Sequence, residues 1–309
     1  MKRITVCVIT YNQEKLIRRA LDSVLQQKEW GLYRIIVSDD CSKDHTWDVL
    51  LEYKANYPEI VCLFRNEHNL GIYGNMAVLR TLLPESDLYC NLSGDDAYCN
   101  GYFEGIQNLI ESSKIDTKEA VGIYSDWKSV TPDGREEIHK QDIVQSGYRL
   151  WSLKARYKIG GRSLMVTKVV RDKYEPILTG CGLNLRESHN DSQPHLYIEK
   201  AYYLPQVTSI YYSDIGISAQ LSQDKSDYFT NQSIEKWEYG LKYYVKDKRD
   251  FHYATFQVLK AKFLMKPSWK LFLKMIYNNE KGQLPICKDS LRTRLFYYKY
   301  WAKMILKHD

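Results

Sequence analysis

The chain has 309 residues and is 44% hydrophobic, which is enough for one large domain with an appendage or for two ordinary domains. No run of eighteen or more apolar residues occurs, so we expect no membrane-spanning helix, and the N-terminus lacks the pattern of a signal peptide. The net charge of +6 is uneven: residues 242–309 hold 16 Lys/Arg against five Asp/Glu, and the remainder holds 28 against 33. The basic C-terminal quarter favours an anionic partner.

The cysteines indicate a reducing compartment. Their number, seven, is odd, they form no CxxC pair, and Cys7, Cys62 and Cys90 lie in apolar strand-like runs. Buried, reduced thiols are the simplest interpretation of this pattern. We therefore expect a cytoplasmic protein.

The first hundred residues alternate between strand-like and helix-like segments. Residues 4–10 form a continuous apolar and β-branched run, which is typical of a parallel strand covered on both faces. Three further strand-like runs follow, at residues 34–38, 60–64 and 88–92. Because crossovers between parallel strands are right-handed, this order predicts a parallel, doubly wound sheet.

Amphipathic helices are expected between these strands. The first begins after Asn12, its expected cap, and places six apolar residues on one face. The second surrounds residues 47–54 with Asp44 as its cap, and the third covers residues 71–83. A looser pattern then predicts a helix at 102–110, mostly loop at 128–162, and strands at 121–127, 164–167 and 202–212. After about residue 220 the pattern is helical to the end.

Polar residues follow three of the four expected parallel strands. They are Thr10-Tyr11-Asn12 after the first strand, Asp39-Asp40 after the second, and Asp95-Asp96 after the fourth. Ligands of parallel α/β sheets bind outside the carboxyl ends of the strands, so these residues are expected to face one crevice. Each acid pair alone is equally compatible with a solvated turn, and Tyr11 with ordinary packing.

The expected crevice lacks the glycine-rich loops that commonly bind phosphate. Neither a GxGxxG turn nor a GxxxxGK[ST] loop occurs, which argues against a Rossmann dinucleotide site and a P-loop. Paired carboxylates are hard oxygen ligands suited to Mg²⁺ or Mn²⁺, and such an ion can bridge a diphosphate. The expected cofactor is therefore Mn²⁺ or Mg²⁺.

Four motifs in order carry a resemblance to a known family. VITYNQEKLIRRALDSVLQQ, IIVSDDCSKDHTWDVL, NEHNLGIYGN and LSGDDAY resemble the successive motifs of family-two glycosyltransferases with the GT-A fold. The resemblance implies a Rossmann-like, mostly parallel sheet flanked by helices, with a helical C-terminal extension. It implies a catalytic domain over residues 1–219, with a nucleotide-sugar half at 1–100 and an acceptor half at 101–219, before a basic, amphipathic region at 220–309.

The same resemblance assigns roles to the donor-binding residues. Tyr11 would stack on the nucleotide base, usually uracil, with Thr10 and Asn12 beside it, and Asp40 would hydrogen-bond that base. Asp96 would bind the metal, and Asp95 would contact the ribose or the metal shell. Ser93 stands where the family motif has its first acid.

Transfer of the sugar would need a general base later in the chain. In LRESHNDSQPHLYIEKAYYLP, Asp191 occupies the place of the family's catalytic aspartate, with Asn190 where glutamate is usual. The resemblance implies that Asp191 deprotonates the acceptor hydroxyl and that the anomeric centre inverts. Glu187 is the second candidate for the base, and Arg162 is a candidate cation near the diphosphate or the acceptor.

The basic tail leaves two interpretations open. On a helical wheel of residues 288–307, basic residues share one side, and Leu291, Leu295, Tyr298, Trp301, Ala302 and Ile305 share another, with Arg294 as a misfit. This pattern is typical of an interfacial helix on an anionic membrane and equally of a helix that packs on the protein. Peripheral contact with the cytoplasmic face would suit a lipid-linked acceptor.

The function expected from these patterns is an inverting, metal-dependent transfer of a sugar, with UDP the favoured carrier, to a glycan or lipid-linked acceptor in surface polysaccharide synthesis. Two alternatives are a non-catalytic nucleotide-sugar or glycan-binding module and a metal-dependent nucleotidyltransferase. The latter class usually has a Gly-rich N-terminal loop, which TYNQEK is not. Nucleic-acid binding by the tail is not expected, because the tail contains no recognised motif.

Overall fold

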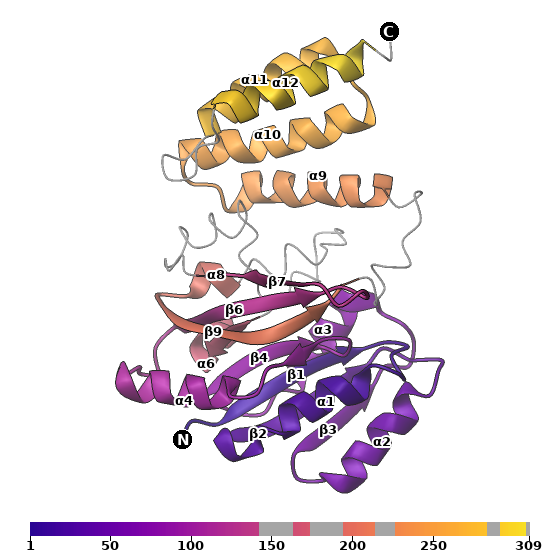
Figure 1. Ribbon diagram of the computed structural model, residues 1–309, viewed down its shortest axis with the longest axis vertical. Helices are drawn as coiled ribbons and strands as arrows, with labels where there is room; N and C mark the ends of the chain where they lie inside the picture. The colour runs from indigo at the N-terminus through magenta and orange to yellow at the C-terminus, as the bar shows by residue number, and fades with distance from the viewer. Residues whose placement is uncertain (142–162, 174–193, 214–225, 283–290, 307–309) are drawn as a thin grey trace. The chain divides into compact units, whose positions relative to one another are not determined.

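The computed structural model describes residues 1–141, 163–173, 194–213, 226–282 and 291–306. The chain divides into two compact units, Met1–Gln220 and Leu221–Asp309, called here the N-terminal and the C-terminal unit. The N-terminal unit is built on a sheet and the C-terminal unit on helices (Figure 1). Within the described part of the chain, no helix is both long and apolar enough to cross a membrane.

Four parallel strands form the first half of the sheet. They are β1 (Ile4–Thr10), β2 (Leu32–Asp39), β3 (Val61–Arg65) and β4 (Leu88–Ser93). β1 lies between β2 and β4, and β2 pairs with β3 on its other side, so the spatial order is β3-β2-β1-β4. These are the four strands that the sequence predicts. Since β2 and β3 lie on one side of β1 and β4 lies on the other, the strand order reverses at β1, and ligands of such sheets bind outside the carboxyl ends of the strands at this point.

The second half of the sheet mixes parallel and antiparallel pairs. Its strands are β5 (Ala97–Tyr98), β6 (Val121–Val130), β8 (Leu164–Thr167) and β9 (Lys200–Tyr212). β8 lies between β4 and β6 and pairs antiparallel with both. β6 and β9 are parallel, and β9 pairs antiparallel with β5, the last strand of the order. The strands predicted at 121–127, 164–167 and 202–212 are confirmed, and the α/β fold class is confirmed with them.

One strand lies where the sequence predicts mostly loop. β7 (Glu136–His139) pairs antiparallel with β6, from Trp127 opposite His139 to Val130 opposite Glu136. A turn closed by Thr131 and Arg135 joins the two strands, and Gly134 adopts a φ of +82° within it. Glu136, Glu137 and Ile138 are exposed, and His139 is half-buried. The strand therefore lacks the alternation of buried apolar and exposed polar residues by which a strand is predicted from sequence.

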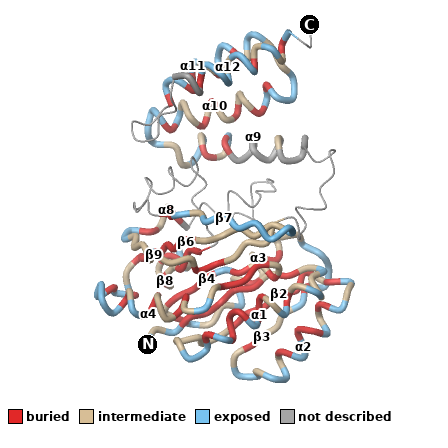
Figure 2. The backbone as a smooth tube through the Cα atoms, viewed as in Figure 1, coloured by how far each residue is buried: buried red, intermediate tan, exposed pale blue. Residues whose placement is uncertain are grey.

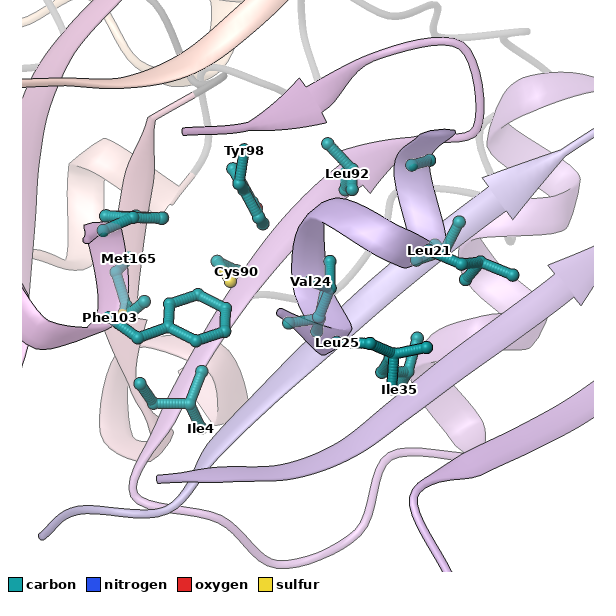
Figure 3. Close-up of a cluster of buried hydrophobic side chains, with 14 of the residues drawn as sticks. Ile4, Leu21, Val24, Leu25, Ile35, Cys90, Leu92, Tyr98, Phe103 and Met165 are labelled. Carbon is teal, nitrogen blue, oxygen red and sulfur yellow. The ribbon is translucent and has the colours of Figure 1, made fainter. Parts of the chain in front are cut away.

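Helices cover both faces of the sheet. The larger core packs apolar residues of α1, α2 and α4 against alternate residues of the strands, such as Ile4, Cys90 and Leu92 (Figure 3). On the opposite face, Leu79 of α3 packs with Cys7 and Ile36. Successive residues of the central strands are therefore buried on both faces, as their continuous apolar runs predict (Figure 2). The bounds are α1 (Ile17–Leu25), α2 (Thr46–Asn56), α3 (Gly71–Thr81) and α4 (Tyr102–Ser112), with short helices η1 (Lys28–Trp30), α6 (Lys168–Lys173) and α8 (Pro194–Tyr197).

The C-terminal unit is helical in its described part, as predicted. It comprises α9 (Ser226–Tyr243), α10 (Lys248–Met265), α11 (Trp269–Gly282) and α12 (Leu291–Ile305). Asp247 caps α10 by accepting hydrogen bonds from the backbone N–H groups of Arg249 and Asp250. The core of the unit is an aromatic-rich cluster of α10, α11 and α12 whose buried members are Phe256, Phe263, Phe272, Met275, Trp301 and Ile305.

Candidate active site

The register of the parallel strands brings three polar segments to one edge of the sheet. Thr10, the last residue of β1, lies opposite Asp39, the last residue of β2. On the other side of β1, Ile9 lies opposite Ser93, the last residue of β4. The segments that follow these residues contain Tyr11, Asn12, Asp40, Asp95 and Asp96, and they start side by side at the crevice.

Asp39 is an internal anchor of this edge. Its carboxylate is fully buried, accepts hydrogen bonds from the backbone N–H and the hydroxyl of Ser42, and lies 3.2 Å from Nε of Arg65. Burial raises the pKa of this carboxyl above its usual value, against the opposing effects of the Ser42 hydrogen bonds and the Arg65 charge. Asp39 therefore holds the β2–α2 loop to β3, a role that the sequence reading did not assign.

Asp40 faces the start of α3. One carboxylate oxygen accepts hydrogen bonds from the Asn66 amide and the Leu70 backbone N–H, both at 2.8 Å, and the other accepts from the Gly71 N–H at 2.9 Å. Gly71 has a φ of +74° and opens the helix, so Asp40 satisfies donors at a helix N-terminus. A carboxylate offers about four acceptor positions, so about one remains for a further donor.

A network of hydrogen bonds between buried polar side chains holds Asn66, one of the donors to Asp40, in place. The Ser38 hydroxyl bonds to the Asn75 side-chain oxygen at 2.5 Å, and that oxygen also accepts from the Asn66 amide at 3.0 Å. The Asn75 amide donates to the Ser38 carbonyl at 2.9 Å. Asn66 and Asn75 are the first and last residues of the NEHNLGIYGN motif, which is the signal that points to them, although their sequence spacing does not reveal that they bond to each other.

The two loops after β1 and β2 are joined by hydrogen bonds. Asn12 has a φ of +51°, its N–H donates to the Ser42 hydroxyl at 2.9 Å, and its side-chain oxygen accepts from the Lys43 N–H at 2.7 Å. The expectation that Asn12 caps the first helix is wrong: α1 starts at Ile17, and the Asn12 side chain is used across the crevice edge instead. Tyr11, directly before it, is half-buried.

Thr10 and Gly94 meet where β1 and β4 end. The Thr10 hydroxyl donates to the side-chain oxygen of Gln13 at 2.7 Å. A Cβ atom on Gly94 would lie 2.3 Å from that Gln13 oxygen and 3.0 Å from the Thr10 hydroxyl oxygen. Glycine thus permits the close approach of the β4 turn to the β1 loop.

The Asp95–Asp96 pair occupies the turn between β4 and β5. Asp96 is buried, its N–H donates to the Ser93 carbonyl at 3.0 Å, and its carboxylate accepts from the Tyr212 N–H at 3.3 Å. Asp95 is half-buried, and its carbonyl accepts a 2.5 Å hydrogen bond from the Arg19 guanidinium. That guanidinium also stacks 3.4 Å from the centre of the Tyr212 ring. The pair is therefore held between α1 and the end of β9.

The fit of this pair to a metal rests on its donor chemistry. Among the described residues, no group of three or more His, Cys, Asp or Glu side chains is arranged to hold an ion. Two adjacent carboxylates still supply hard oxygen ligands, and Mg²⁺ is commonly held by one or two carboxylates together with substrate phosphates. The residues present thus fit a divalent ion shared with a diphosphate.

Three predicted site residues lie outside the described residues: Arg162, Glu187 and Asp191. The description resumes at α8, which begins at Pro194, in agreement with the first helical turn expected there. In this short helix His195 is fully buried, and its Nδ1 lies 2.5 Å from the Tyr124 hydroxyl on β6. Helix α8 is therefore tied to the second half of the sheet.

The chain has a fold known from solved glycosyltransferase structures. It resembles S. aureus TarS 1-349 in complex with UDP-GlcNAc, with a TM-score of 0.60 and 14% identity over 90% of this chain and 80% of that chain. It also resembles the mannosyltransferase PcManGT from Pyrobaculum calidifontis in complex with GDP-Man and Mn²⁺, with a TM-score of 0.53 and 12% identity over 99% of this chain and 86% of that chain. The fold is that of the GT-A glycosyltransferases.

A sequence comparison bears on the same residues as the motifs. Residues 5–80 match the model of glycosyl transferase family 2, which confirms the resemblance read from the motifs of this segment. The dTDP-rhamnosyl transferase RfbG of Shigella flexneri is 30% identical over 105 residues, 33% of this chain and 35% of that protein. An uncharacterized protein of Mycobacterium tuberculosis is 35% identical over 94 residues, 30% of this chain and 27% of that protein. The chain thus spans about a third of the length of these curated relatives.

Proposed function

We propose that this chain transfers a sugar from a nucleoside diphosphate sugar to a hydroxyl of a glycan or lipid-linked acceptor, in the synthesis of a surface polysaccharide. One observation carries the proposal: Asp40 and the Asp95–Asp96 pair follow β2 and β4, the two strands that flank β1, where the strand order reverses. The named relatives support the donor class, since they include a dTDP-rhamnosyl transferase and proteins bound to UDP-GlcNAc and GDP-Man.

Base recognition is assigned to the β1 and β2 loops. Asp40 has about one acceptor position left after its three internal hydrogen bonds, and a uracil N3–H is a donor of the right kind. Tyr11 is half-buried beside it and offers a ring on which a base can stack. Thr10 and Asn12 hold this loop in place through Gln13 and the β2–α2 loop. UDP is therefore the nucleotide that we expect.

The diphosphate is assigned to the β4–β5 turn. Asp96 and Asp95 would hold Mn²⁺ or Mg²⁺, which stabilises the charge of the leaving diphosphate when it is bound. Arg19 adds a fixed positive charge beside this turn, because its guanidinium is already oriented by the Asp95 carbonyl and the Tyr212 ring. The complex of the mannosyltransferase PcManGT with Mn²⁺ supports the choice of metal.

The transfer step is assigned to Asp191. Its carboxylate would take the proton of the acceptor hydroxyl as that oxygen attacks the anomeric carbon, and the nucleoside diphosphate leaves from the opposite face with inversion. Arg162 would supply a cation near the diphosphate or the acceptor. Glu187 is the alternative base.

Asp191→Asn tests this assignment. We expect turnover to fall by about 10²- to 10⁴-fold, because the amide cannot accept the proton, while UDP binds as tightly as to the wild type. Glu187→Gln is the matched control and should keep its turnover. Wild-type turnover in Asp191→Asn would remove Asp191 from the mechanism, and its loss in Glu187→Gln alone would move the role of base to Glu187.

The donor is tested with a panel of UDP-, GDP- and dTDP-sugars, by following nucleoside diphosphate release with Mn²⁺, with Mg²⁺ and with a chelator. We expect release from a UDP-sugar that depends on the ion. Saturation-transfer NMR on the same panel detects binding without turnover. Binding without release, even with acceptor glycans added, would favour a non-catalytic module, and no response to any donor would contradict the proposed function.

The acceptor is placed at a membrane surface in this proposal. The basic region over residues 288–307 would bring the protein to the cytoplasmic face of an anionic membrane, where a lipid-linked acceptor is presented. The described part of this region is α12, in which some side chains are buried and others are exposed.

A further inference from the structure

The apolar side of α12 read from the helical wheel is used inside the C-terminal unit. Trp301 and Ile305 are buried in the unit's core, with Tyr298 packed against them. Leu295 is 47% exposed and departs from this stripe. This stripe therefore holds the helix on the protein and cannot also face a lipid surface.

Arg294, the basic residue on the apolar side of the helical wheel, forms an ion pair with Glu280. Its guanidinium is buried and pairs with the Glu280 carboxylate of α11, which also accepts a 2.7 Å hydrogen bond from the Tyr298 hydroxyl. The ion pair links α11 to α12 and neutralises the acid of α11. Glu280 is the only acid in the sequence of α11, and α12 contains no Asp or Glu between Leu291 and Ile305, so the other charged residues of both helices are basic.

The opposite side of α12 combines large apolar groups with lysines. Phe296 and Tyr300 are 67% and 56% exposed, and Lys299 and Lys303 are exposed between and after them. These positions have the i, i+3, i+4, i+7 spacing of a single helix face. Leu306 extends the row and is 66% exposed.

Helix α11 repeats the same arrangement. Lys270, Leu273, Lys274, Tyr277 and Lys281 share this spacing and are all exposed, with Leu273 and Tyr277 at 64% and 56%. Exposed bulky apolar side chains that alternate with lysines on two adjacent helices are unusual for a surface that faces only water. The ten residues of the two rows are called here the basic–apolar face.

We propose that the basic–apolar face docks on an anionic phospholipid membrane. The aliphatic and aromatic side chains, Leu273, Tyr277, Phe296, Tyr300 and Leu306, would enter the boundary between headgroups and acyl chains, where tyrosine keeps its hydroxyl in water. The lysines would bury their methylene stems and place their ammonium groups among anionic headgroups. The positive charge of its lysines favours an anionic membrane over a neutral membrane or a protein surface with few acidic residues.

The membrane contact is independent of donor binding, since no residue of the basic–apolar face belongs to the site at the sheet edge. Its test is flotation of the full chain with vesicles of phosphatidylcholine alone and of phosphatidylcholine mixed with phosphatidylglycerol. We expect binding to the anionic vesicles only, weakened by salt. Lys299→Glu/Lys303→Glu and Lys270→Glu/Lys274→Glu should each weaken it at least about tenfold, and Phe296→Ser/Tyr300→Ser should weaken it at low salt as well.

Lys28→Glu/Lys118→Glu is the matched control, because it makes the same change of charge at exposed lysines of the N-terminal unit. It should bind the vesicles nearly as the wild type does, and circular dichroism should show that every variant is folded. Equal losses in the control and the test variants would overturn the proposal, as would absence of flotation. A wild-type dimer in light scattering that the face variants convert to monomer, without flotation, would assign the face to self-association. UDP binding, measured in parallel, reports separately on the donor site.

Discussion

Asp39 and Asp40, at the end of β2, have different roles, which the residues around each of them determine. Asp39 bonds to Ser42 and Arg65 and anchors the loop, whereas Asp40, which is also buried, accepts hydrogen bonds at the start of α3. The two residues are chemically identical and adjacent in the sequence. Substitutions at the two positions should therefore affect different properties, stability at Asp39 and donor binding at Asp40.

The raised pKa of Asp39 leads to a prediction about acid. A carboxyl whose pKa is higher in the folded than in the unfolded protein takes up its proton first in the folded state as the pH falls. The free energy of unfolding of the wild type, relative to Asp39→Asn, should therefore rise as the pH falls through the folded pKa toward the unfolded value near 3.8. Urea denaturation of both proteins from neutral to acidic pH measures this difference. A wild type that instead loses stability relative to the variant on acidification would contradict it.

At the scale of elements, the acid pair is positioned by a contact between helix and sheet. Arg19 of α1 bonds to the Asp95 carbonyl and stacks on Tyr212 of β9, while the Tyr212 N–H reaches the Asp96 carboxylate. Two elements, α1 and β9, thus set the position of one turn. The metal affinity of the turn should depend on this contact.

Tyr212→Leu removes the ring under Arg19 but keeps the backbone donor to Asp96. Since a cation–π contact contributes roughly 0.5–2 kcal/mol, we expect the Mn²⁺ concentration for half-maximal nucleotide release to rise about two- to thirtyfold. Tyr212→Phe retains the ring and should behave as the wild type. Equal Mn²⁺ dependence in the leucine and phenylalanine variants would show that the stacking does not position the turn.

Glycine has a packing role where α11 meets α10. A Cβ on Gly282 would lie 2.7 Å from the backbone nitrogen and 2.9 Å from Cα of Tyr253, atoms that cannot move independently of α10. Although Gly→Ala usually stabilises a helix, Gly282→Ala should destabilise the C-terminal unit by about 1–3 kcal/mol through overpacking. Thermal unfolding followed by circular dichroism measures the change, and an increase in melting temperature would refute the close approach.

At the scale of the whole molecule, each unit has its own core. Apolar residues of the sheet and of α1, α2 and α4 form one, and those of α10, α11 and α12 form the other. We expect a fragment of residues 1–220 to unfold cooperatively and to bind UDP, because the core of the N-terminal unit lies within it. Chemical denaturation and calorimetric titration test the two properties. A fragment without a cooperative transition would mean that the first core needs the second unit.

The predictable part of the fold is the part in which local patterns agree with tertiary packing. β1 to β4 follow from continuous apolar runs, because strands of a parallel sheet are buried on both faces. β7 has no such signal, since its exposed residues are held by pairing with β6. Asn12 has the residue type of a helix cap, but the β2–α2 loop offers its side chain a donor that the sequence does not place nearby.

The order of the parallel strands along the chain, the resemblance of residues 5–80 to glycosyl transferase family 2, and the acids that follow β2 and β4 are all readable from the amino-acid sequence. These features are local: a run of apolar residues or a motif carries them entirely. Contacts of the folded chain were needed to show that Asp39 anchors its loop while Asp40 bonds to the start of α3, that Arg19 and Tyr212 hold the acid pair, and that the aromatic stripe of α12 is turned inward. Each of these depends on contacts between residues far apart in the chain, and burial and charge there are set by the partner that folding supplies.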